Sequence, residues 1–407
     1  MNSPLFQRAV RVIPGGIPGH QSPVFTVPGQ FPYFAKRAEG PFYWDEGGNR
    51  YIDFLCAYGP LVLGAGRPEV AAAVAAAEAG GICFNHPTEW TVRLAERLVE
   101  MVDIADWAFF GKNGADMTYW SIRVAREHTG RRKILRFLHA YHGTDPWCTD
   151  CSAGVVEGDR ADILQAPWND TAALNAIFDL HGHELAGIIS TPFDHPNYAD
   201  MTLPDPAFQR AIRRGLDACG GLWIYDDVRC GFRHHLGGTH RYFDCSPDLI
   251  CYSKALANGY AIAACVGRES FRAAASKVFA TGSFWNNPGP FAAALATIDL
   301  LEQESVIPGI LRRGQEWVDG FLALGEKHGI EFRASGTPAL PYIRVADDPG
   351  FFRQQAFCAT AIKHGIFLHP HHNWFIGHAH SEAVLEESLA RVEAAILDFQ
   401  VEVACPA

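Results

Sequence analysis

Long apolar segments are what this sequence most clearly lacks. No window approaches about 18 consecutive apolar residues, the length that a membrane-spanning helix requires. The N-terminus also lacks a charged stretch followed by an apolar run, which is the pattern of an export signal. We therefore expect neither membrane insertion nor export, and we predict a cytoplasmic protein.

Positive charge is scarce as well. The chain has 34 lysines and arginines against 45 aspartates and glutamates, which gives a formal net charge of −11. A protein that binds nucleic acid needs a basic face, and no such face is visible in the sequence. We expect small-molecule ligands and no nucleic acid.

Metal-ligand spacings are also missing. The eleven cysteines are an odd number scattered among expected strands and helices, which indicates reduced, mostly buried thiols. Cys148 and Cys151 form a C-x-x-C motif without a second pair at zinc-finger spacing, so an ordinary loop is favoured. The histidine-rich segment 369–380 has no carboxylate or cysteine at a diagnostic spacing, and we favour a strand and turn near a substrate mouth over a metal site. Its histidines are His369, His371, His372, His378 and His380.

What the sequence does contain is an ordinary globular composition and a regular succession of elements. The 407 residues are 48% hydrophobic and 19% charged, which is enough for a large core and a second domain. Strand and helix patterns alternate over residues 107–267, which predicts a mostly parallel, doubly wound α/β sheet. We predict an N-terminal arm with part of a small domain in residues 1–60, a large domain in 61–300 and a small α+β domain in 301–407.

The remaining expectations concern single elements. The proline- and glycine-rich stretch within the first forty residues excludes a regular helix or central strand there. A turn at residues 45–49 predicts a hairpin. Expected helices cover residues 69–79, 89–102, 115–128, 206–219, 291–304, 311–328, 351–364 and 382–399, and expected strands cover 107–110, 132–138, 184–191, 261–267, two pieces of 330–345, and 366–368.

The stretch from Leu222 to Tyr260 carries the chemistry. An apolar run ends in Asp226 and Asp227, and a second apolar run, 249–252, precedes Lys254. Buried parallel strands deliver such residues to one edge of a sheet, where ligands bind. A lysine and a carboxylate together suit pyridoxal phosphate, which forms an imine with a lysine and needs an acid to keep its ring nitrogen protonated. The alternative is a solvated turn and a surface lysine.

A second region predicts an anion site. The strand at 107–110, the loop Gly111-Lys112-Asn113-Gly114 and the following helix together present backbone N–H groups and a positive dipole end, which suit a phosphate. A plain connection between strand and helix is the alternative. After the next strand, Tyr141 could lie over a flat ring. His142 is either a site residue or a core histidine whose ring nitrogens are hydrogen-bonded within the protein.

Seven motifs occur along the chain in a fixed order: IPGG (13–16), YIDF (51–54), GPLVLG (59–64), IRVAREHTGRRKI (122–134), YHG (141–143), DDVRCGFR (226–233) and PDLICYSK (247–254). Taken together and in this order, they resemble the class III, fold-type I pyridoxal-phosphate aminotransferases over essentially the whole chain. The pattern is similar to the glutamate-1-semialdehyde aminomutase-like group, and KNGAD, AYHG, DDVR, KALANGY and TGSFW look like its aminopolyol branch, which includes the aminotransferase of hydrolysed fumonisin.

The resemblance implies a role for individual residues. It makes Lys254 the lysine that forms the aldimine, Asp226 the partner of the pyridine nitrogen, and Val228 and Tyr141 the residues on the two ring faces. Asn113, Gly114 and Ala115 fall at the phosphate cradle, with His142 beside the cofactor. Ser283 falls where a residue of the second subunit reaches the phosphate, which implies a homodimer with sites at the interface.

Departures from the pattern concern the substrate. Asp227 replaces a glutamate, Thr191 stands in place of another, and Phe25 stands where the aminomutase has an arginine. We expect an aminotransferase that moves an amino group from an amine or amino-polyol donor to a 2-oxo acid such as pyruvate. The alternative is an aminomutase. Phe25, Tyr58 and Trp285, the last either from this chain or from the neighbouring subunit, would form an apolar wall for the donor. Arg229, unless it is a surface residue, would hold the carboxylate of the acceptor.

Overall fold

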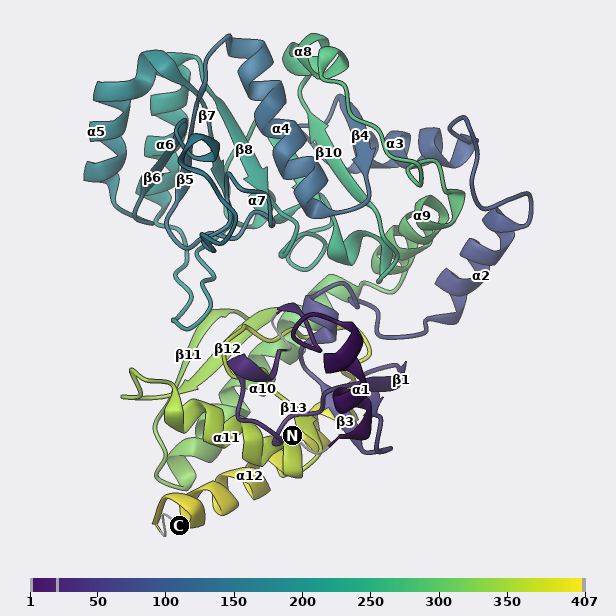
Figure 1. Cartoon of the computed structure of the whole chain (residues 1–407), viewed down its shortest axis with the longest axis vertical. Coiled ribbons are helices and arrows are strands. Elements are labelled where there is room, and N and C mark those ends of the chain that lie inside the picture. Colours follow the sequence, from purple (N-terminus) through teal and green to yellow (C-terminus); the bar gives the residue numbers. More distant parts are fainter. Residues whose placement is uncertain (1–2, 20–21, 405–407) are drawn as a thin grey trace.

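The chain folds into two parts that lie one above the other in Figure 1. The structure is a computed structural model and describes residues 3–19 and 22–404. The larger part contains a seven-stranded sheet, and the smaller part contains a four-stranded and a two-stranded sheet. No helix within these described residues is both long enough and apolar enough to cross a membrane.

The seven-stranded sheet has the order β4-β10-β9-β8-β7-β5-β6. Six strands run parallel and only β10 is antiparallel to its neighbours. The predicted mostly parallel, doubly wound sheet is therefore confirmed. The strands are β4 (Trp107–Gly111), β5 (Lys133–Phe137), β6 (Ile163–Ala166), β7 (Leu185–Ser190), β8 (Leu222–Asp226), β9 (Leu249–Tyr252) and β10 (Ala263–Gly267).

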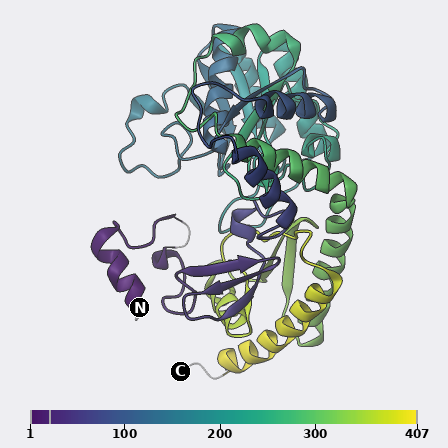
Figure 2. The same cartoon turned by 90° about the vertical axis from the view of Figure 1, so that its right-hand side faces the viewer.

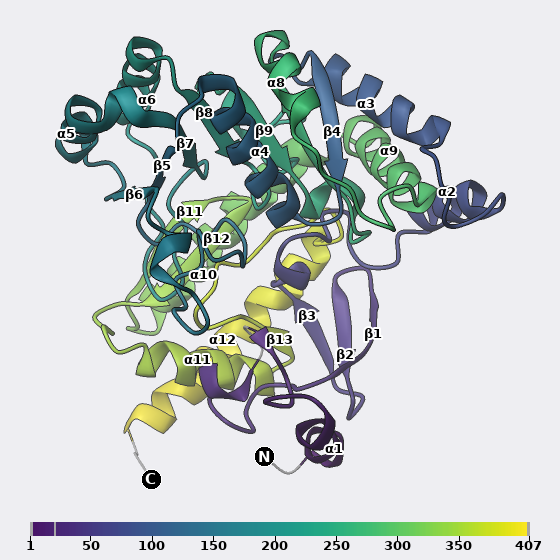
Figure 3. The same ribbon diagram turned by 45° about the horizontal axis from the view of Figure 1, so that its top comes forward.

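Both faces of this sheet are buried, which is why its strands read as continuous apolar runs. In β8, Leu222 and Ile224 face one apolar cluster, while Trp223 and Tyr225 face the other. Helices α4 (Gly114–Thr129) and α8 (Arg272–Lys277) cover the first face, and Figure 3 shows α4 lying across the sheet. The other face packs against α3 (Glu89–Met101), α5 (Thr171–His181), α6 (Pro206–Cys219) and α9 (Pro288–Gln303).

The smaller part joins the two ends of the chain. Its four-stranded sheet has the order β1-β2-β3-β13, in which Ile366 of β13 pairs with Ile52 of β3. The expected hairpin around residues 45–49 is confirmed as β2 and β3. The elements are β1 (Ala35–Glu39), β2 (Phe42–Asp45), β3 (Arg50–Asp53), β11 (Phe332–Thr337), β12 (Leu340–Val345), β13 (Ile366–Phe367), α10 (Val306–Lys327), α11 (Phe352–Lys363) and α12 (Glu382–Ala404).

Some elements differ from the sequence prediction. The N-terminal helix α1 (Pro4–Val12) was not expected, and Figure 2 shows it at one side of the smaller part. Helices α9 and α10 begin three and five residues before the predicted starts at 291 and 311. Prolines in their first turns explain the difference, because proline is tolerated where its missing N–H has no helical partner. Strand β6 and the helices α2 (Pro68–Glu78), α5, α7 (Thr239–Tyr242) and α8 complete the fold.

The cysteines behave as predicted. The ten that lie among the described residues are all free thiols, and six of them are buried. Within the same residues, no group of three or more histidine, cysteine, aspartate or glutamate side chains is arranged to hold a metal ion.

Candidate active site

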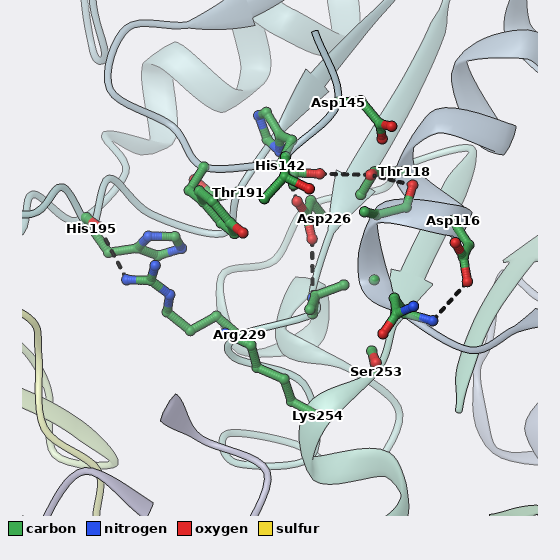
Figure 4. A pocket seen from close by; sticks show the side chains of 17 residues that line it. Asp116, Thr118, His142, Asp145, Thr191, His195, Asp226, Arg229, Ser253 and Lys254 are labelled. Atoms are coloured by element: carbon green, nitrogen blue, oxygen red, sulfur yellow. Dashed lines mark hydrogen bonds and ion pairs between the residues drawn. The ribbon is translucent and has the colours of Figure 1, made fainter. Parts of the chain in front are cut away.

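A cavity of about 480 Å³ lies where five strands of the large sheet end (Figure 4). Strands β4, β5, β7, β8 and β9 run parallel, so the residues that follow them meet at one edge of the sheet, where ligands of open α/β folds bind. The cavity is lined by residues 113–116, Thr118, residues 141–145, Thr191, His195, Asp226, Val228, Arg229, Ser253 and Lys254.

A buried carboxylate and a buried imidazole form a pair in this cavity. Asp226 ends β8, and its Oδ2 lies 2.7 Å from Nδ1 of His142. The backbone N–H of Val228 donates to Oδ1 of Asp226 at 3.2 Å. The ring of His142 is nearly parallel to that of Trp147 at 6.1 Å, and the carbonyl oxygen of His142 accepts from the Thr118 hydroxyl at 2.7 Å. His142 is thus both buried and part of the cavity wall, so the two interpretations of the sequence are not exclusive.

Lys254 enters the same cavity from the end of β9. It opens a short 3₁₀ helix, Lys254–Ala257, with φ of +39°, a left-handed conformation that non-glycine residues avoid and that is found at functional sites. Burial, and after it the positive charge of Arg229, lower the pKa of Lys254 from 10.5 to about 7, while the charge of Asp226 acts in the opposite direction. The amine is therefore largely neutral above pH 7, the form in which an amine acts as a nucleophile.

The start of α4 forms the opposite wall of the cavity. Asp116 accepts hydrogen bonds from the backbone N–H groups of Lys112 (2.9 Å) and Asn113 (2.8 Å), so its carboxylate caps the loop before the helix. The N–H groups of Gly114 and Ala115, as the first of the helix, have no partner within it and remain for an anion. Gly114 is needed here because an added Cβ would come within 2.8 Å of Val228 Cγ1.

Arg229 is a buried residue of the cavity wall. Its side chain is 7% exposed, so the alternative that it is a surface residue is wrong. Its Nη1 donates to the carbonyl oxygen of His195 at 3.1 Å and to Oδ1 of Asn373 at 3.0 Å, as Figure 4 shows for the first of these contacts. Burial lowers the pKa of Arg229 from its ordinary value of 12.5.

Not every residue that the sequence singles out lines this cavity. Asn113, Gly114, Ala115, Tyr141, His142, Asp226, Val228, Arg229 and Lys254 line it, whereas Phe25, Tyr58, Ser283 and Trp285 do not. Phe25 borders a neighbouring hollow, and Tyr58 meets the ring of His372 edge to face at 5.2 Å. Trp285 packs edge to face on Phe109 at 6.2 Å, and Ser283 is exposed on the loop before α9.

Asp227 does not take part in the cavity. Its Oδ2 accepts from the backbone N–H of Thr239 at 2.7 Å, deep in the large part of the molecule. Burial raises the pKa of Asp227 to about 8. The expectation that both carboxylates face the crevice therefore applies to Asp226 alone, because successive residues of a strand point to opposite faces.

Sequence reasoning missed one polar residue of the cavity, His195. This histidine lines the cavity five residues after β7 and is 4% exposed. Its position after a buried strand is the signal that would have identified it, as for Asp226 and Lys254.

In the histidine-rich segment 369–380, three rings contact backbone carbonyl oxygens. His371 contacts that of Phe25 at 2.8 Å, His372 that of Asn373 at 2.7 Å and His380 that of Asp53 at 3.1 Å.

Comparison with known proteins agrees with this geometry. The family model for class III aminotransferases matches residues 26–393. The chain is 39% identical to the aminopentol aminotransferase of Sphingopyxis macrogoltabida over 96% of its own length and 92% of that protein. It is 31% identical to a glutamate-1-semialdehyde 2,1-aminomutase of Neisseria meningitidis, with 96% and 97% covered.

A solved structure supports the same conclusion. The FumI protein of Sphingopyxis sp. MTA144, in its PLP internal aldimine form, superimposes with a TM-score of 0.96 and 38% identity, covering 98% of this chain and 96% of that one. The predicted resemblance, fold and cofactor are thereby confirmed. From its motifs, its sheet and the matched length, this chain belongs to the class III aminotransferase family of fold-type I enzymes that depend on pyridoxal 5′-phosphate.

Proposed function

We propose that this protein transfers an amino group from an amine or amino-polyol donor to a 2-oxo acid such as pyruvate, with Lys254 as the lysine that carries the cofactor. The observation that carries the proposal is that Lys254, the Asp226–His142 pair and the start of α4 face one cavity. An amine nucleophile, a buried acid and an anion site are the three functions that this cofactor requires of a protein.

The residues present fit pyridoxal 5′-phosphate. The N–H groups at the start of α4 suit its phosphate, and the space kept open by Gly114 next to Val228 would close if a Cβ were added. Tyr141 and Val228 are proposed for the two faces of its ring, and Asp226 for its ring nitrogen. When bound, the cofactor supplies an electron sink that stabilises negative charge on the carbon that bears the amine.

The protein itself moves the proton. When it is not bound to the cofactor, the Nζ of Lys254 would be a neutral base, since burial and Arg229 lower its pKa to about 7. We propose that Nζ would take the proton from the amine-bearing carbon of the donor and would return it to the carbon through which the cofactor would carry the amino group. Asp226, held by His142 and by the N–H of Val228, keeps its carboxylate directed at one point of the cavity, so that a proton on the ring nitrogen is retained.

The donor and the acceptor need different contacts. Arg229 is the cation proposed for the carboxylate of the 2-oxo acid, because it lies in the cavity wall and its described hydrogen bonds use only Nη1. At position 25 the chain has phenylalanine where the aminomutase pattern has arginine, which supports a donor without a carboxylate at that end. The relative named an aminopentol aminotransferase supports an amino-polyol.

A homodimer is part of the proposal. Ser283 and the neighbouring Phe284 and Ile82 lie on the surface, and the two large apolar side chains are 71% and 63% exposed. The segments that carry them touch, since Cys83 Sγ donates to the carbonyl oxygen of Ser283 at 3.4 Å. An exposed apolar patch of this kind is typical of an interface. We propose that a second copy covers it and that Ser283 reaches the phosphate of the partner's cofactor. The free thiols support a reducing, cytoplasmic setting.

Steady-state assays test the main point. A panel of simple amines and amino-polyols is assayed with pyruvate and with 2-oxoglutarate, and the conversion of glutamate-1-semialdehyde is measured in parallel. We expect transamination of the amines and poor use of the semialdehyde, because a buried carboxylate without an arginine partner is disfavoured by about 1.5–3 kcal/mol. Efficient conversion of the semialdehyde to 5-aminolevulinate, with the amines inert, would replace this proposal by the aminomutase.

A further inference from the structure

One wall of the cavity carries buried polar atoms that have no hydrogen-bond partner among the described residues. His195 is 4% exposed and lines the cavity together with Lys254, and neither Nδ1 nor Nε2 of its ring has a partner in the part of the chain that the structure describes. The ring is held edge to face against Phe193 at 5.6 Å. Buried polar groups are usually hydrogen-bonded, so an orphaned pair in a cavity indicates a ligand.

The same wall continues into a smaller hollow. Oδ1 of Asn197, two residues further along, and Nδ1 of His371 are likewise buried without partners among the described residues. Both side chains line a hollow of about 160 Å³ with Phe25, Tyr198 and His369. The two segments are joined, because the N–H of Tyr198 donates to the carbonyl oxygen of His371 at 3.2 Å and their rings stack at 4.2 Å.

Arg229 connects the hollow to the reacting end of the cavity. Its Nη1 donates to the backbone of His195 on one side and to the amide of Asn373 on the other. The cation thus ties the two segments together next to Lys254, as Figure 4 shows for Arg229, His195 and Lys254. The polar wall, defined as His195, Asn197 and His371, begins beside the reacting amine and runs away from it.

The charge state of the polar wall limits what it can bind. Burial, and then the charge of Arg229, hold the pKa of His195 well below its usual value, and burial lowers the pKa of His371 to about 4. Both rings are therefore neutral at physiological pH. A neutral imidazole donates at one nitrogen and accepts at the other, and an amide oxygen accepts. The complementary ligand is an uncharged group that both donates and accepts, namely a hydroxyl.

We propose that the polar wall of His195, Asn197 and His371 binds hydroxyl groups on the donor chain beyond the amine-bearing carbon, and that it selects hydroxylated amines over purely aliphatic ones. This inference rests on the proposed function, since it names the residues that set donor specificity at the same site. His195 contacts the hydroxyl nearest the reacting carbon, and Asn197 and His371 contact hydroxyls further along.

A matched pair of donors tests the polar wall. The holoenzyme is assayed with 2-aminooctane and with 2-aminooctan-3-ol, which differ by one hydroxyl, and pyruvate is the acceptor. We expect kcat/KM for the amino alcohol to be about 10²-fold higher, because the aliphatic amine leaves the nitrogens of His195 buried and unpaired. In His195→Phe this ratio falls to within about threefold of one, and His195→Gln, which keeps a donor and an acceptor, retains most of it.

A second readout and a control make the result specific. Analogues in which a methyl group replaces the hydrogen on the amine-bearing carbon cannot react, so the change in the cofactor's absorption gives their Kd, and the Kd ratio should follow the kcat/KM ratio. His183→Phe, an exposed histidine in the short helix Gly182–Glu184, serves as the matched control and should leave both ratios unchanged. If His195→Phe does not fold, Asn197→Leu with an amine that carries a more distant hydroxyl replaces it.

The outcomes separate this inference from the proposed function. A ratio that is the same in wild type and in His195→Phe overturns the polar wall while transamination stands. A variant that raises the KM for pyruvate and leaves the donor ratio unchanged also overturns it, because the wall then serves the acceptor. If the wild type converts no amine at all, the proposed function fails, and the Kd ratios of the unreactive analogues still decide whether the wall recognises hydroxyls.

Discussion

The depressed pKa of Lys254 can be measured directly on the apoenzyme. A lysine with the ordinary pKa of 10.5 is only about 0.3% neutral at pH 8, whereas a lysine with a pKa of about 7 is about 90% neutral, a difference of roughly 300-fold in reactive amine. We expect a short pulse of acetic anhydride to acetylate Lys254 with a midpoint near pH 7. Quantitative mass spectrometry of the peptides gives the profile, with the exposed Lys36 as the reference in the same molecule.

Two variants test the direction in which neighbouring charges shift the pKa of Lys254. Arg229 lowers the pKa of Lys254 through its positive charge, so Arg229→Gln should move the midpoint to higher pH. Asp226 raises the pKa of Lys254, so Asp226→Asn should move the midpoint to lower pH. Labelling of Lys254 that rises in parallel with Lys36 up to pH 10 would refute the reasoning. A downward shift in Arg229→Gln would show that Arg229 does not act on Lys254 by its charge.

Four further predictions follow from the same geometry. Asp226→Asn should lower kcat by about 10²–10³-fold while the cofactor still binds, and near-normal turnover would count against its role. Gly114→Ala should weaken cofactor affinity, since the new Cβ would lie 2.8 Å from Val228 Cγ1, and adding Val228→Ala should restore part of it in equilibrium dialysis. The pKa of Asp227 is about 8 in the folded protein against an ordinary value of 3.8, so the native state holds this proton more tightly than the unfolded state does. The free energy of unfolding should therefore decrease between pH 4 and pH 8. Urea unfolding should show a smaller decrease for Asp227→Asn, which has no carboxyl proton to lose. Sedimentation should give a dimer, and Ser283→Asp should weaken cofactor binding by repelling its phosphate, whereas a fully active monomer would contradict the interface.

The sequence predicts the large sheet well because both of its faces are covered. An apolar run such as Leu222–Tyr225 alternates between two buried clusters, and this leaves a signal that does not depend on distant contacts. Asp226 and Lys254 could be assigned to one crevice for the same reason, since parallel strands end at a common edge. The helix starts were less accurate, because prolines in the first turn look like breaks although the geometry there permits them.

The rest of the site depends on contacts that no local pattern encodes. The pairing of His142 with Asp226 joins residues 84 positions apart, and the contact of Arg229 with Asn373 joins residues 144 apart. His195 follows a buried strand, as Asp226 and Lys254 do, but it lies five residues into an irregular loop, which does not by itself determine where the ring points. Ser283 and Trp285 do not reach the cavity of their own chain, so their predicted roles depend on a second copy.

The pairing of β3 with β13 determines the order in which the molecule can be completed. Strand β3 is synthesised well before β13, its parallel neighbour in the sheet, which follows only after roughly 310 further residues. At ordinary elongation rates this is a wait of about 15–60 s. During that time the large sheet, whose strands all lie within residues 107–267, can form while the hairpin edge at Arg50–Asp53 has no partner strand. Unpaired edges bind other strands. The newborn chain therefore exposes the unpaired edge of this hairpin to other strands until residues 366–367 of β13 have been synthesised and can pair with β3.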